Sequence, residues 1–235
     1  MFVQVIGSGS SGNCYYISDG ASSLMLDAGI CLRKVKMNMK FKASSVAGCL
    51  ITHEHSDHIR SAEALCKMGV ECFMSEGTYL KSVKHYRMSI IKKKFKAGTF
   101  NITTFDLEHD SAQPIGYLIR SSLTGESLLY ATDTASIPTT WDNLNYILVE
   151  ANWSQSLLDT NITNGLMTSE MKERLIRTHF SLAKVVDFLW ATDMSKVKQI
   201  HLIHLSHKNA NKELFVNTVQ EIFGKETYAW GTTVG

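Results

Sequence analysis

Three histidines and one aspartate fall within six residues of this sequence: His53, His55, Asp57 and His58. They follow the apolar run Val46 to Thr52, which predicts a buried strand. They precede a run with helical spacing of apolar residues, Ile59 to Met68, ended by Gly69. Because a loop between a buried strand and a helix is held rigidly, functional groups commonly lie there. The sequence therefore predicts a strand, a polar loop and a helix, with the functional side chains in the loop.

The spacing of this cluster indicates metal binding. Several imidazoles and a carboxylate near a core edge are costly to leave unpaired, and a metal ion satisfies them together. In an extended turn His53 and His55 project to one side and can share one ion. Asp57 and His58, turned away by the start of the helix, can reach a second ion. The H-E-x-x-H motif of other zinc proteins is excluded, because Asp57 occupies the place of its second histidine.

Short runs rich in β-branched and aromatic residues predict nine strands. They are Phe2 to Ile6, Cys14 to Ser18, Leu24 to Asp27, Val46 to Thr52, Phe100 to Phe105, Ile115 to Arg120, Ser127 to Thr132, Tyr146 to Glu150 and Gln199 to Leu205. Helical spacing predicts helices at Ile59 to Met68, Ser169 to Arg177, Leu182 to Trp190 and Lys212 to Phe223. Strands outnumber helices early and alternate with them late, which predicts an α/β fold of two sheets with helices outside.

Composition limits the class of protein. A chain of 235 residues with 44% hydrophobic and 20% charged residues predicts one globular domain, residues 1–235. No apolar run approaches the ~18 residues that span a bilayer, and no signal core follows Met1, so no membrane partner is expected. The five cysteines are scattered without a C-x-x-C pair, which favours a reducing compartment over a disulfide framework. We therefore expect a cytoplasmic protein.

The segment Gly7-Ser8-Gly9-Ser10-Ser11-Gly12 matches the G-x-G-x-x-G pattern of dinucleotide sites. That fingerprint requires a helix after the glycines, so that the pyrophosphate can lie at the helix N-terminus. Here a strand follows, beginning near Cys14. The sequence predicts a hairpin turn instead.

The H-x-H-x-D-H cluster resembles the signature of the metallo-β-lactamase-fold hydrolases, and the resemblance spans nearly the whole chain. It implies a four-layer αββα sandwich. It also implies that Asp27 orients the metal-binding loop from outside the ligand shell. His109 resembles the third ligand of the first metal, and Asp133 the acid that bridges both ions. His204, with its His-x-Ser setting, resembles the last ligand of the second metal, although His201 and His207 are rivals by spacing.

Seven nitrogen and oxygen ligands without cysteine suit zinc, manganese or iron. We expect two divalent metal ions, zinc first and manganese as the alternative. Antibiotic-degrading relatives typically carry cysteine where Asp133 stands, so the aspartate favours phosphodiesters or thioesters over β-lactams. Two such ions clamp a phosphodiester and bring the pKa of a bridging water to about neutral.

His179, in Thr178-His179-Phe180-Ser181, stands immediately before a capped helix and ahead of His204-Leu205-Ser206. This order resembles the phosphodiesterase branch that includes ribonuclease Z. The resemblance implies that His179 acts in catalysis, as does Asp57; a surface-loop histidine is the alternative. Ser11 and Asn13 are candidate substrate contacts. Glu150 and Asn152 either support the metal site or are merely structural.

Within that branch, the segments Ser8 to Asn13 and His109 to Tyr117 resemble two groups of proteins. One is the bacterial exonuclease-like proteins associated with cell-wall regulation, and the other is the phage anti-Pycsar phosphodiesterases. A net charge of +2 favours a small substrate, because polymer binding depends on many phosphate contacts. We therefore predict hydrolysis of 3′,5′-cyclic nucleotides such as cyclic CMP and cyclic UMP by a phage protein that counteracts host signalling. The resemblance implies a homodimer, and a phage-encoded protein would lie in the host cytoplasm.

Three alternatives stay open. A DNA or RNA nuclease becomes the better prediction if the basic segment Lys81 to Lys96 lines the mouth of the site. Another metallo-hydrolase, such as a thioesterase, is the second alternative. The third is a non-catalytic protein that binds nucleotides.

Overall fold

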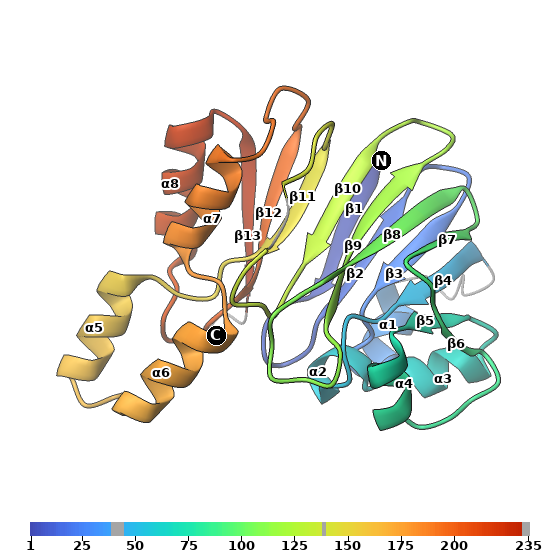
Figure 1. The fold of residues 1–235 in the computed structure, drawn as a ribbon, viewed down its shortest axis with the longest axis horizontal. Coiled ribbons are helices and arrows are strands. Elements are labelled where there is room, and N and C mark those ends of the chain that lie inside the picture. Colours follow the sequence, from blue (N-terminus) through green and yellow to red (C-terminus); the bar gives the residue numbers. More distant parts are fainter. Residues whose placement is uncertain (39–44, 138–139, 232–235) are drawn as a thin grey trace. The chain divides into compact units, whose positions relative to one another are not determined.

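The computed structural model describes residues 1–38, 45–137 and 140–231, and the chain divides into two compact units (Figure 1). The first unit comprises Met1–Asp106 and Ser111–Glu126, and the second comprises Leu107–Asp110 and Ser127–Gly235. No helix in the described ranges is long and apolar enough to cross a membrane. The single domain expected over residues 1–235 stays a prediction.

The first unit contains a six-stranded sheet in the order of the sequence. Its strands are β1 (Phe2–Gly7), β2 (Cys14–Ser18), β3 (Ser23–Leu26), β4 (Val46–Leu50), β5 (Cys72–Met74) and β6 (Met88–Ile90). Strands β1 to β3 pair antiparallel and β3 to β6 pair parallel. The short helices are α1 (Leu32–Asn38), α2 (Ser56–Ile59), α3 (Ala62–Lys67) and α4 (Glu76–Lys81). A buried apolar cluster that includes Met25, Ile51 and Leu65 joins the sheet to the helices.

Three further strands of the first unit pair antiparallel: β7 (Lys94–Ala97), β8 (Phe100–Asp106) and β9 (Ile115–Ser121). The glycine-rich loop joins β1 to β2, which pair antiparallel, so the predicted hairpin is confirmed. Gly9 and Gly12 have φ angles of 100° and 137°, a region that glycine enters at no steric cost.

The second unit is built on four parallel strands. They are β10 (Ser127–Ala131), β11 (Tyr146–Glu150), β12 (Gln199–Leu205) and β13 (Glu226–Gly231). Its helices are α5 (Gln155–Thr163), α6 (Ser169–Thr178), α7 (Leu182–Trp190) and α8 (Lys212–Phe223), of which α8 packs against β12 and β13 (Figure 1). Every residue of β10 and β11 is buried, as expected of parallel strands covered on both faces.

Helix α7 begins after the N-cap Ser181, and helix α8 ends at Gly224, as the sequence predicts. The Ser181 side chain accepts a hydrogen bond from the backbone N–H of Lys184, and Leu182, Val185 and Leu189 are buried. Gly224, with φ 62°, ends α8.

The predicted helix over Ile59 to Met68 is wrong in its extent, because α2 and α3 are separate helices there. Between them the backbone N–H of Ser61 donates to the carbonyl of Ala28, at 2.8 Å, and the Ser61 hydroxyl donates to that of Ile30, at 2.6 Å. These tertiary hydrogen bonds draw the chain out of a continuous helix.

Candidate metal centre

In the first unit, the polar loop lies between β4 and α2, as the sequence predicts. The ring centroids of His53 and His58 are 4.1 Å apart, and those of His53 and His55 are 4.7 Å apart. His53 and His58 are buried, while His55 and Asp57 are half-buried. The structure therefore gathers the three imidazoles of the motif within the first unit.

Asp27, which directly follows β3, fastens this loop. Its carboxylate Oδ2 lies 2.7 Å from Nδ1 of His58, and its Oδ1 accepts from the backbone N–H of Thr52 at 2.8 Å. Asp27 is fully buried and has a left-handed φ of 57°. A carboxylate that accepts the Nδ1 proton of a histidine leaves Nε2 to bind a metal ion. Asp27 thus has the geometry that its predicted role requires.

Thr52 joins the same network and was not singled out from the sequence. Its hydroxyl donates to both carboxylate oxygens of Asp27, at 3.1 and 3.0 Å, and lies 3.0 Å from Nδ1 of His53. The sequence signal that could have identified Thr52 is a hydroxyl at the end of a predicted buried strand, immediately before His53. The same hydroxyl lies 3.4 Å from Nδ1 of His58, so Thr52 connects Asp27 to two imidazoles.

The loop is also held from the glycine-rich hairpin. The backbone N–H of Asn13 donates to the carbonyl of Asp57 at 2.7 Å, and Asn13 Nδ2 lies 3.0 Å from His58 Nε2. Gly29 passes so close that a Cβ there would stand 1.6 Å from the same carbonyl. Asn13 is fully buried, whereas Ser11 is exposed. Substrate binding by Ser11 and Asn13 stays a prediction.

In the second unit, four titratable side chains converge at the ends of strands and helices. They are Asp133, Glu150, His179 and His204, and one ligand atom from each lies within 4.8 Å of the others. His109 joins them, with Nε2 3.7 Å from Oδ2 of Asp133. Asp133 and His204 have φ angles of 47° and 52°, a strained region for residues other than glycine. Such strain is characteristic of functional sites.

Glu150, at the end of β11, is fully buried and holds this cluster. Its Oε1 lies 2.6 Å from Nδ1 of His179, and its Oε2 accepts from the backbone N–H groups of Thr134 and Phe180, at 2.9 and 3.1 Å. Burial alone raises the pKa of Glu150, but the charge of His179 and hydrogen bonds from His179 and His204 outweigh it and lower that pKa. Burial acts to lower the pKa of His179, and Glu150 and Asp133 raise it overall. The pair therefore favours a carboxylate beside a protonated imidazole.

Among the three rival histidines near the end of β12, only His204 lies in this cluster. Its Nδ1 is 3.1 Å from Oε1 of Glu150 and 3.4 Å from Oδ1 of Asp133. Asn152 Nδ2 donates to the backbone carbonyl of His204 at 2.9 Å. His201 instead stacks on Tyr228, and His207 is exposed.

The chemistry of the donors fits divalent metal ions. Both units present imidazole nitrogens and carboxylate oxygens in buried or half-buried positions. Cys14 and Cys49 compete poorly for a metal ion, because burial raises the pKa of their thiols and disfavours the thiolate that binds metal. The pKa of His109 is lowered, chiefly by burial, which keeps its imidazole in the neutral form that binds metal.

A family model described as a Beta-lactamase superfamily domain matches residues 23–205, and the chain belongs to this family. Exodeoxyribonuclease WalJ of Streptococcus pneumoniae serotype 2 is 29% identical over 231 residues, covering 90% of this chain and 84% of that protein. Exodeoxyribonuclease YycJ of Bacillus anthracis is 26% identical over 247 residues, covering 97% of this chain and 91% of that protein. The crystal structure of the metallo-beta-lactamase fold protein YhfI from Bacillus subtilis has a TM-score of 0.70 and 16% sequence identity, covering 97% of this chain and 95% of that one.

These findings confirm the metallo-β-lactamase fold and its α/β class. They also confirm that the chain is an enzyme, a metal-dependent phosphodiester hydrolase of the branch that the sequence predicts. The individual metal ligands and the catalytic role of His179 stay predictions.

Proposed function

We propose that this protein is a metal-dependent nuclease that removes nucleotides from a DNA strand. One observation carries the proposal: the metal-binding loop and the start of the basic segment line the same pocket of the first unit. Glu54 and Ser56 come from the loop, and Lys81, Ser82 and Val83 come from the segment. A basic segment beside this loop supports the nuclease alternative, which depends on the segment lining the mouth of the site.

The charge of that segment supports a polymeric substrate. Residues 81–96 contain seven lysines and arginines and no acidic residue, so the rest of the chain is net negative. Concentrated positive charge attracts a phosphate backbone, even where the net charge of the whole protein is small. Tyr86 is 83% exposed within the segment and lies beside Arg87, whose guanidinium carbon is 5.2 Å from its ring centroid. Exposed aromatic rings among basic side chains are typical of single-strand binding.

The similar proteins WalJ and YycJ are both exodeoxyribonucleases, and each aligns with most of this chain. This similarity favours DNA over RNA as the substrate.

We assign the metal ligands as the resemblance implies. His53, His55 and His109 would hold one ion, and Asp57, His58 and His204 the second, with Asp133 shared. Two bound divalent ions, zinc first and manganese second, would offset the charge of the phosphate and supply an ionised water near neutral pH.

The role of His179 follows from its partner. Glu150 orients Nδ1 of His179 and raises the pKa of the imidazole, so the protonated ring would carry a proton at Nε2 for a leaving oxygen. Asp57 would take part in catalysis as a ligand. In this proposal Glu150 is a positioning residue, which acts by orienting His179.

Hydrolysis of 3′,5′-cyclic nucleotides is the second candidate. The net charge of +2 and the resemblance of the hairpin segment Ser8 to Asn13 to the anti-Pycsar enzymes favour it. A phage role, a homodimer and a cytoplasmic location belong to that candidate and stay predictions.

A substrate panel tests both candidates. The purified protein, loaded with Zn²⁺ or Mn²⁺, is incubated with end-labelled single-stranded DNA, duplex DNA and RNA, and with cyclic CMP, cyclic UMP and cyclic AMP. We expect mononucleotide release from single-stranded DNA and loss of that activity in Asp133→Ala. Hydrolysis of cyclic nucleotides alone would establish the second candidate, and unchanged turnover in Asp133→Ala would contradict the assigned metal ligands.

A further inference from the structure

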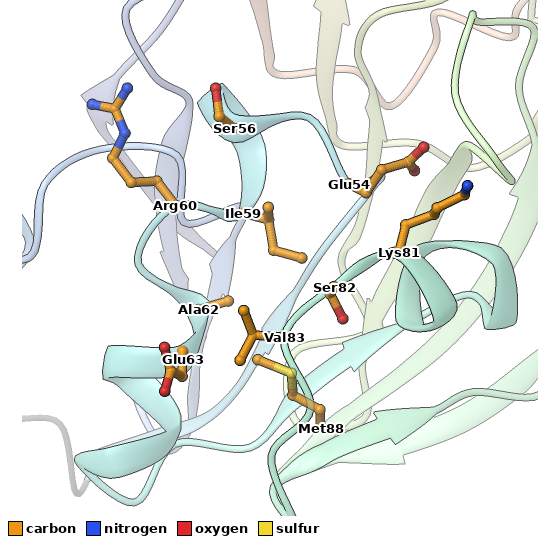
Figure 2. A pocket seen from close by; sticks show the side chains of 10 residues that line it. All are labelled: Glu54, Ser56, Ile59, Arg60, Ala62, Glu63, Lys81, Ser82, Val83 and Met88. Atoms are coloured by element: carbon orange, nitrogen blue, oxygen red, sulfur yellow. The ribbon is translucent and has the colours of Figure 1, made fainter.

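The pocket beside the metal-binding loop has a volume of about 280 Å³, and all its lining residues belong to the first unit (Figure 2). Its centre is apolar, formed by Ile59, Ala62, Val83 and Met88. Pockets that enclose drug-sized ligands occupy roughly 300–1,000 Å³, so this one suits a single ring system.

The position of the pocket relates it to the loop. The side chains of Glu54 and Ser56 line it, and these two residues alternate with His55 and Asp57 along the chain. Glu54 lies in the bend before α2 and Ser56 is the first residue of that helix, so a group in the pocket would lie against the sequence neighbours of the predicted ligands His55 and Asp57.

The charges around the pocket balance. Arg60 and Lys81 are matched by Glu54 and Glu63. Glu63 pairs with Lys67 at 2.6 Å, and Glu54 accepts a hydrogen bond from the backbone N–H of Ala112 at 2.8 Å. Balanced charge offers a phosphate no net attraction, whereas an apolar centre with a polar rim suits a neutral ring with a polar edge.

We propose that this pocket binds a nucleobase of the DNA strand, next to the nucleotide that is cut. The inference rests on the proposed nuclease function and names the part of the substrate that the first unit recognises. Lys81, at the edge of the pocket, is the first residue of the basic segment 81–96, which contains no aspartate or glutamate. The DNA strand that supplies the base would therefore continue along residues 81–96.

The test measures binding without cleavage. Fluorescence anisotropy measures the affinity of the metal-loaded protein for a series of phosphorothioate oligonucleotides. Each oligonucleotide carries one abasic sugar, at a different position. Since an abasic sugar leaves the apolar centre of the pocket unfilled, we expect one position at which it weakens binding about tenfold. At every other position the affinity should change less than threefold.

Two matched variants locate that effect. Val83→Trp fills the pocket from a residue that is 61% exposed, and Leu123→Trp adds the same side chain at a residue that is 60% exposed and does not line the pocket. Val83→Trp should abolish the dependence on the abasic position, and Leu123→Trp should keep it. Equal weakening at every position, or the same behaviour in both variants, would overturn the inference.

Failure of the nuclease proposal gives a different result. A protein that discriminates the abasic position but cuts no strand contradicts the nuclease and supports the pocket. In a parallel assay with phosphodiester versions of the same oligonucleotides, a protein that cuts every abasic substrate equally well keeps the nuclease and overturns the pocket. Absence of oligonucleotide binding overturns both.

Discussion

Nδ1 of His179 lies 2.6 Å from Oε1 of Glu150, a carboxylate with no exposure to solvent. The second oxygen of that carboxylate is held by two backbone N–H groups, so the imidazole is oriented by a group that cannot itself turn. This arrangement makes the charge of Glu150 testable through the activity of the enzyme.

Glu150→Gln removes that charge while keeping the shape of the side chain. Because Glu150 raises the pKa of His179, the variant should protonate His179 less readily, and the alkaline limb of the kcat profile should move to lower pH. General acid catalysis contributes about 10²–10⁴-fold, so we expect kcat to fall at least about a hundredfold at pH 8. Glu213→Gln, on the exposed face of α8, is the control. A lower kcat with an unmoved alkaline limb would show that Glu150 acts only in folding.

Asp27→Asn weakens the contact that fixes Nδ1 of His58. Loss of such a partner typically lowers metal affinity about 10–100-fold, and we expect that loss in titrations with a fluorescent metal chelator as competitor. Asp106→Asn changes an exposed aspartate at the end of β8 and should bind metal as the unchanged protein does. Equal affinity in Asp27→Asn would contradict the predicted role of Asp27.

Gly29→Ala would force a methyl group to within 1.6 Å of the Asp57 carbonyl. The loop must move to accept it, and overpacking of this kind costs typically about 1–3 kcal/mol of the free energy of unfolding. Metal binding should fall as well, since the same loop carries the ligands. Gly125→Ala, with φ 73° and no atom within 4 Å, should lose only about 1–2 kcal/mol and keep its metal affinity. Urea unfolding measures the loss of stability in each variant, and metal titration distinguishes the two.

His201 predicts a dependence of stability on pH. Burial lowers its pKa to about 4, whereas an unfolded histidine titrates near 6.5. The unfolded chain therefore binds more protons below about pH 6.5, and the folded state loses stability as the pH falls from about 6.5 towards 4. The loss approaches about 3 kcal/mol at most, from a shift of roughly 2.5 units.

His201→Phe keeps a ring to stack on Tyr228 but removes the titrating group. Urea unfolding of the metal-free protein at pH 7 and pH 5 should show a smaller difference in this variant than in the unchanged protein. His207→Phe, at an exposed position, should retain the full difference. An identical pH dependence in all three proteins would exclude His201 as its source.

The sequence predicted those helices and strands whose two ends are both marked by nearby residues. Strands β11 and β12 and helix α7 have the predicted bounds, because continuous apolar runs or a capped apolar stripe mark both ends. Strands β5 and β6 were not predicted, since three residues each are too few to show alternation.

The same limit applies to the site. The loop from His53 to His58 was visible because its ligands are nearly consecutive. The role of Glu150 was left open, because its partner His179 is 29 residues away in sequence and comes near it only through folding.

Three of the residues assigned to the metal site, Asp27, Asp133 and His204, have a left-handed backbone conformation. This conformation costs a residue other than glycine about 1–2 kcal/mol. Glycine at these positions would relieve the strain and remove the functional side chain in the same step. Selection for thermostability alone would therefore erode the site, and the continued presence of these side chains depends on selection for the reaction itself.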